Sequence, residues 1–204
     1  MTMAAKSKSS RSSRKEVPDG TELLVLELQE IHSAESQLAR VLPRVTKAVE
    51  SENLRKFVEL RLEQGERLIG ELETALEELE ESPGRKKNVA AEGLINDMRE
   101  HIQEIAQSPS LDAVLIAALQ KTEHYCVAAW GTAKALGQAM EQKTVVRSME
   151  RALKEGKSLD EELTQLAERE VTRAILSQNS GDEEPESDGK SARRGGRSEN
   201  EKRG

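Results

Sequence analysis

Aromatic residues are almost absent from this sequence of 204 residues, which contains one Trp, one Tyr and one Phe. β-sandwiches and barrels depend on aromatic and β-branched strand residues, and no segment alternates between apolar and polar residues with a period of two. Charged residues make up 34% of the chain, and Leu, Ala, Glu, Lys, Arg and Gln, which favour helices, dominate it. The composition therefore excludes a β fold and predicts an all-α fold.

Cysteine and long apolar runs are also scarce. Cys126 is the single cysteine, so no intramolecular disulfide can form, which fits a reducing compartment. No apolar run is long enough to span a bilayer, and the basic N-terminal residues are not followed by the hydrophobic segment of a secretory signal. We therefore expect a cytoplasmic protein that has no membrane partner.

Positive charge is the minority charge, since the net charge of the chain is −7. Residues 1–18 carry a local charge of +4 and residues 179–204 a local charge of −1, which leaves −10 for the part between them. An acidic body argues against a face that binds duplex nucleic acid, because such a face needs clustered Lys and Arg. Any nucleic-acid contact is expected to be weak and to involve the basic N-terminal tail.

The two ends of the chain differ in composition from its centre. Residues 1–18 and 178–204 contain almost no side chains that a core could bury, so they are predicted to be a disordered basic tail and a disordered charged tail. Between them, residues 19–177 are predicted to form one helical domain.

Apolar residues within this domain recur at steps of three and four. This spacing predicts helices over residues 19–50, 51–81, 89–106, 111–140 and 144–176. Pro83 and Pro109, each beside serine or glycine, lie in the breaks on either side of the short third helix. Four long helices with a shorter one in the middle predict an antiparallel four-helix bundle with a crossover helix.

A carboxylate lies on the apolar face of the first predicted helix. Glu35 is four residues after Ile31 and three before Leu38, near the middle of that face. An unpaired carboxylate in a core costs several kcal/mol, so Glu35 must be protonated, paired with a base or bound to a cation. His32 precedes it by three residues and can share its face. A metal ligand and a structural, Arg-paired carboxylate are both compatible with this pattern.

Two further acids occupy similar positions. Glu123 lies on a stretch from Leu111 to Gly131 that has only three charged residues and is therefore expected to be buried. Asp160 lies one turn after Gly156 on the inner face of the last predicted helix. The candidate metal ligands are thus Glu35, Glu123, Asp160 and His32. The alternative for each acid is an ion pair with an Arg or Lys of a neighbouring helix.

Three strings carry a resemblance to a known family: LELQEIHSAESQLARVLPRVTKA, AAEGLINDMREHI and LDAVLIAALQKTEHYCVAAWGTAKAL. Together they resemble the YciE/YciF family of bacterial ferritin-like proteins, over about residues 21–168. The resemblance implies a ferritin-like fold, a homodimer, a role in stress responses and a carboxylate-rich di-iron centre with ferroxidase-like activity. Its cofactor would be iron or another divalent cation.

The chain departs from this family at several positions of the implied centre. Glu35, Glu123 and Asp160 match family acids, whereas other residues replace ligand-type or neighbouring family residues: His32, Gln64, Gly65, Leu68, Cys126 and Gly156. Two irons need about four carboxylates, so too few remain. The favoured hypothesis is a ferritin-like stress protein with a partly degenerate metal site that holds one cation. The alternative is a metal-free protein that keeps the bundle for interaction or dimerisation. Neither hypothesis assigns a catalytic residue.

Overall fold

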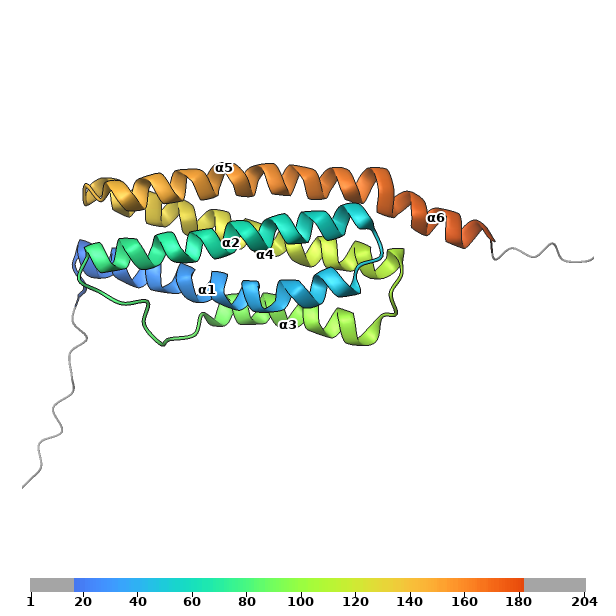
Figure 1. Ribbon diagram of the computed structural model, residues 1–204, viewed down its shortest axis with the longest axis horizontal. Coiled ribbons are helices and arrows are strands. Elements are labelled where there is room, and N and C mark those ends of the chain that lie inside the picture. The colour runs from blue at the N-terminus through green and yellow to red at the C-terminus, as the bar shows by residue number, and fades with distance from the viewer. Residues whose placement is uncertain (1–16, 182–204) are drawn as a thin grey trace, which may run out of the picture.

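The computed structural model describes residues 17–181, and every regular element in this range is a helix (Figure 1). The elements are α1 (Gly20–Ala48), α2 (Glu52–Glu78), α3 (Val89–Glu104), α4 (Pro109–Ala139), α5 (Lys143–Leu166), the π-helix η1 (Ala167–Val171) and α6 (Thr172–Gly181). The predicted all-α helical bundle is confirmed. Within residues 17–181, no helix is long and apolar enough to cross a membrane.

The four long helices pack as two antiparallel pairs. Short connections join α1 to α2 and α4 to α5, so the members of each pair run in opposite directions (Figure 1). Helix α1 also contacts α4, and α2 contacts α5, which closes the bundle. The shorter α3 lies on the outside against α1 and α4 and carries the chain back between α2 and α4. This crossover corresponds to the helix predicted over residues 89–106.

Side-chain caps explain why the helices begin where the sequence predicts. Asp19 accepts a hydrogen bond from the backbone N–H of Glu22, and the Glu22 carboxylate accepts one from the backbone N–H of Asp19, which forms a capping box. Ser51, Asn88 and Ser108 cap α2, α3 and α4, each through one side-chain oxygen that accepts a hydrogen bond from a backbone N–H group in the first turn. These caps satisfy N–H groups that a helix leaves free in its first turn.

The C-terminal end of the bundle differs from the prediction in detail. A single helix was predicted to end at 176, whereas the structure has five residues of π-helix after α5 and then α6, which ends at Gly181. A π-helical turn contains more residues than an α-helical turn, and over five residues the spacing of apolar side chains does not distinguish the two. The predicted disordered tails lie mainly in residues 1–16 and 182–204, outside the described residues.

The core of the bundle is divided into two apolar clusters. One contains Leu38, Val58, Leu119 and Leu159, and the other contains Ile31, Leu68, Cys126 and Ala152. On every long helix the named members of the two clusters are therefore about two to three turns apart. The residues between them form the central layer of the bundle, and they include charged side chains.

Candidate functional site

A buried arginine occupies the centre of this layer. Arg61 of α2 lies between Glu35 of α1 and Glu123 of α4, and all three residues are at most 2% exposed. The guanidinium donates from Nη1 and Nη2 to the two oxygens of Glu35, each at 3.1 Å. Its Nε donates to Oε1 of Glu123 at 2.5 Å. One guanidinium thus bridges carboxylates from two other helices.

The electrostatics of this layer are uneven, because one base faces two acids. Burial alone would lower the pKa of Arg61, but the carboxylates of Glu123 and Glu35 raise that pKa well above its ordinary value. Burial raises the pKa of Glu123 above 4.5, against the lowering effect of Arg61, and the nearby Glu35 raises it further. Oε2 of Glu123 is buried with no hydrogen-bond partner among the described residues. Arg61 is therefore always charged, and burial makes Glu123 easier to protonate than a carboxyl in water.

The site is shaped to admit the arginine side chain. A Cβ added at Gly65, four residues after Arg61 on α2, would lie 3.0 Å from Nη1 of Arg61 and 3.2 Å from Oε2 of Glu35. The indole of Trp130 lies on another side, with its ring centroid 5.8 Å from the guanidinium carbon, within range of a cation–π contact. A Cβ at Gly156 would in turn lie 2.5 Å from the Trp130 ring. Both helix-interior glycines thus make room for the Arg61–Trp130 arrangement.

Cys126 lies beside the ion pair on α4. Its Sγ is 3.9 Å from Nη2 of Arg61, and its side chain is buried. Burial raises the pKa of the Cys126 thiol well above its ordinary value, and the neighbouring Glu35 and Glu123 contribute in the same direction. Since the thiolate is the metal ligand and the nucleophile, this thiol has little of the reactive form.

The four residues predicted as metal ligands do not share one set of contacts. Glu35 and Glu123 meet at Arg61, whereas Asp160, with its side chain 29% exposed, lies 3.2 Å from Nε2 of His124. His32 is partly buried, and its Nε2 lies 3.1 Å from Oε1 of Glu73 on α2. Asp160 is near enough to contribute to the raised pKa of Glu123. The structure thus brings two of the four together and places the other two in separate polar pairs.

The donor set at the centre does not fit a di-iron group. Both inward carboxylates already accept hydrogen bonds from Arg61, and the adjacent thiol is held in its protonated form. Among residues 17–181, no group of three or more His, Cys, Asp or Glu side chains is placed to hold a metal ion. A guanidinium between two carboxylates supplies the positive charge that a cation would otherwise supply.

Arg61 is the residue that the sequence analysis missed. It lies three residues after Val58 and four before Gly65, so the period that identified Glu35 also places it on the buried face of α2. The next residue, Leu62, is more apolar than Arg61 but is only partly buried. A charged residue followed four positions later by a glycine on a buried helix face is the signal that could have found it.

Comparison with known proteins identifies the family. The family model described as a domain of unknown function, DUF892, matches residues 19–176. Protein YciF of Escherichia coli K12 is 34% identical over 147 residues, which cover 72% of this chain and 89% of YciF. The resemblance to the YciF type is thereby confirmed.

Solved structures agree with this result. The crystal structure of the E. coli stress protein YciF matches with a TM-score of 0.73 and 32% identity, over 77% of this chain and 99% of that one. YcfI from Rhodopseudomonas palustris matches with a TM-score of 0.68 and 28% identity, over 76% of this chain and 97% of that one. The chain, whose central layer holds Arg61 between two carboxylates, belongs to the DUF892 family of YciF-like helical bundles.

Proposed function

We propose that this chain is a metal-independent member of its family, a helical stress-type protein that acts as a scaffold rather than as a ferroxidase. The observation that carries the proposal is the position of Arg61, whose guanidinium binds both inward carboxylates, Glu35 and Glu123. A metal ion at this layer would have to displace the guanidinium of Arg61, which is covalently attached to α2. Removing one partner of a buried ion pair costs about 3–5 kcal/mol, which any metal-binding energy would first have to offset.

The other hypothesis, a degenerate site that holds one cation, requires free carboxylates. Glu35 and Glu123 are engaged, and Asp160 and His32 lie in pairs with His124 and Glu73. A cation could bind under this hypothesis only if at least one of these pairs broke.

The stress role is supported by the similarity to YciF, which is described as a stress protein. A scaffold role is consistent with YcfI, for which a structural role has been suggested. Self-association to a homodimer and a cytoplasmic location remain part of this proposal. The dimer is checked by sedimentation equilibrium of the purified chain, which should give twice the mass of one chain.

Ferrous iron oxidation tests the proposal. Purified protein is mixed with Fe(II) in air-saturated buffer and the ferric product is followed by absorbance, with a known ferritin as the positive control. The wild-type chain should oxidise iron no faster than buffer alone. Arg61→Met, which frees both carboxylates, is compared in the same assay. Saturable oxidation by the wild type that Glu35→Gln abolishes would refute the proposal.

A further inference from the structure

A basic groove lies on the outside of the bundle, away from the central ion pair. Helix α1, the connection between α2 and α3, and α3 together form it, with a volume of about 530 Å³. Five cationic side chains line the groove, and no carboxylate does: Arg40, Arg85, Lys86, Lys87 and Arg99. Since the chain as a whole has a net charge of −7, this local excess of positive charge needs a physical reason.

Neighbouring acids neutralise only the two lysines. Lys86 lies 3.3 Å from Oε1 of Glu30, and Lys87 forms an ion pair with Glu92. His32, which also lines the groove, lies 3.1 Å from Glu73. Among residues 17–181, the three arginines of the groove have no such carboxylate partner.

Within residues 17–181, Arg40, Arg85 and Arg99 form no ion pair with a carboxylate of this chain. Arg99 donates from Nη1 to Oδ1 of Asn96 at 3.1 Å, and its Nε is buried without a hydrogen-bond partner in the same range. Arg99 is therefore held by a single side-chain hydrogen bond and has donors left over for an acceptor.

The backbone on one side of the groove is fixed to α1. Gln29 donates from Nε2 to the carbonyl of Ser82 at 2.8 Å, at the start of the connection. At its end, Ser33 Oγ accepts a hydrogen bond from the N–H of Asn88 at 2.9 Å, and Gln37 Nε2 donates to the carbonyl of Asn88 at 3.0 Å. Asn88 is 2% exposed. The basic segment between these anchors is therefore held in place before any ligand binds.

The chemistry of the groove matches a compact polyanion. Guanidinium groups bind phosphate oxygens through paired N–H donors, and a volume of about 530 Å³ is typical of small-molecule sites. A nucleic acid would extend beyond the groove over a helical body whose net charge is −10, where phosphates are repelled. We propose that this groove binds a small anion that carries two or three linked phosphate groups, with Arg40, Arg85 and Arg99 as its main ligands. This site is independent of whether the central layer binds metal.

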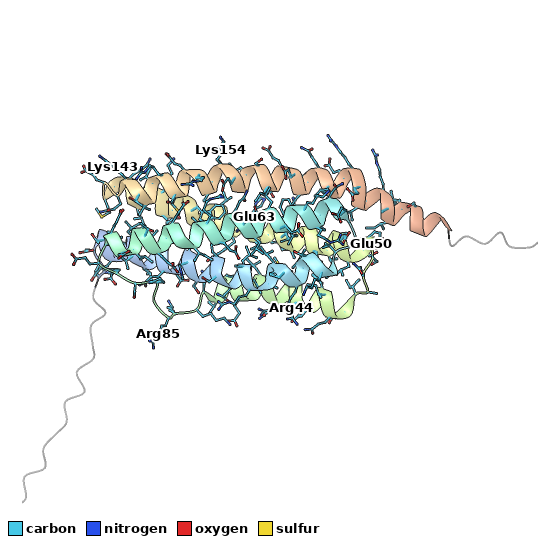
Figure 2. The ribbon with its side chains drawn as sticks, viewed as in Figure 1. Arg44, Glu50, Glu63, Arg85, Lys143 and Lys154 are labelled. Atoms are coloured by element: carbon cyan, nitrogen blue, oxygen red, sulfur yellow. The ribbon has the colours of Figure 1, made fainter. Side chains whose placement is uncertain are left out.

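Calorimetric titration with inorganic triphosphate tests the proposal. At physiological ionic strength, the full chain should bind one triphosphate per chain. Arg40→Gln combined with Arg99→Gln should weaken binding at least about tenfold, because two charge-assisted contacts are lost. Arg85→Gln alone, on the exposed connection (Figure 2), should weaken it several-fold even if the double variant fails to fold.

Arg44→Gln is the matched control. Arg44 is another exposed arginine of α1 (Figure 2), four residues after Arg40, and it does not line the groove, so its replacement should change the affinity less than about twofold. Three results would overturn the proposal: no binding of triphosphate to the wild type, an equal loss in Arg44→Gln, or tighter binding of single-stranded oligonucleotides that increases with their length. The last result would assign the groove to nucleic acid.

Discussion

The guanidinium of Arg61 and the carboxylate of Glu35 form a two-point hydrogen-bonded pair between α2 and α1, with both N–O distances at 3.1 Å and both side chains buried. The two donors of the guanidinium match the two acceptors of the carboxylate in spacing, so the pair fixes the register of the two helices as well as compensating charge. Glu123 adds α4 to the same contact. The free energy of unfolding should therefore depend strongly on Arg61, the base of this layer.

Replacing Arg61 with Met should destabilise the fold by about 3–5 kcal/mol at neutral pH, because two carboxylates would remain buried without a counter-charge. The free energy of unfolding in urea measures the change. Adding Glu35→Gln and Glu123→Gln to the same chain should recover most of it. Arg67→Met is the matched control on α2, since Arg67 is 41% exposed and its ion pairs are at the surface. That control should cost less than about 1 kcal/mol, and an equal loss in both variants would contradict a special role for Arg61.

Glu123→Gln should change how stability depends on pH. Because the pKa of Glu123 is raised above 4.5 in the folded chain, the folded state holds a proton that the unfolded chain releases. The resulting stability is complete below pH 4.5 and is lost as the pH rises through the folded pKa. The variant has no such loss, so its stability relative to the wild type should increase over that range. Glu63→Gln, which removes an exposed carboxylate of α2, is the control. If the difference in the free energy of unfolding between Glu123→Gln and the wild type did not change with pH, the prediction would be contradicted.

Gly156→Ala should destabilise the bundle although alanine favours helices. The added Cβ would lie 2.5 Å from the ring of Trp130, which is 3% exposed and has little room to move. Overpacking of this kind costs about 1–3 kcal/mol, against a gain of up to about 1 kcal/mol from helix propensity. Gly70→Ala is the control, since nothing lies within 4 Å of its Cβ position, and it should stabilise by about 0.5–1 kcal/mol. Thermal unfolding, followed by circular dichroism and Trp130 fluorescence, should show a lower Tm for Gly156→Ala and a higher Tm for Gly70→Ala. A higher Tm for both variants would contradict the packing argument.

Cys126 should be unreactive in the folded chain. Its thiol is buried, and its pKa is raised well above the ordinary value, so the thiolate that attacks disulfide reagents is scarce. Ellman's reagent should modify Cys126 slowly in native buffer and rapidly in urea. Equal rates in the two conditions would mean that the central layer opens readily.

The helices could be predicted from the sequence because each feature that sets them is local. The apolar period and the caps at Asp19, Ser51, Asn88 and Ser108 all act within one or two turns of the chain. The burial of Glu35 and Glu123 could be predicted for the same reason, since it follows from the faces of their own helices.

The partner of those acids could not be predicted in the same way. Arg61 has its role through the pairing of α2 with α1 and α4, which sequence spacing does not encode. Asp160 shows the opposite case. The period of its helix places it on the inner face, but its side chain is 29% exposed and lies beside His124. A shift of one residue rotates a side chain by about 100° around the helix axis, which moves it from the centre of a bundle to its edge, and period analysis has a similar uncertainty.

The metal content of the protein tests the central claim most directly. The chain is produced in iron-supplemented cells, purified without chelator, and analysed by mass spectrometry for iron, manganese and zinc per chain. Because Arg61 occupies the position between Glu35 and Glu123, the account predicts far less than one metal ion per chain. Two irons bound per chain, and released when Glu35 is changed to Gln, would contradict it.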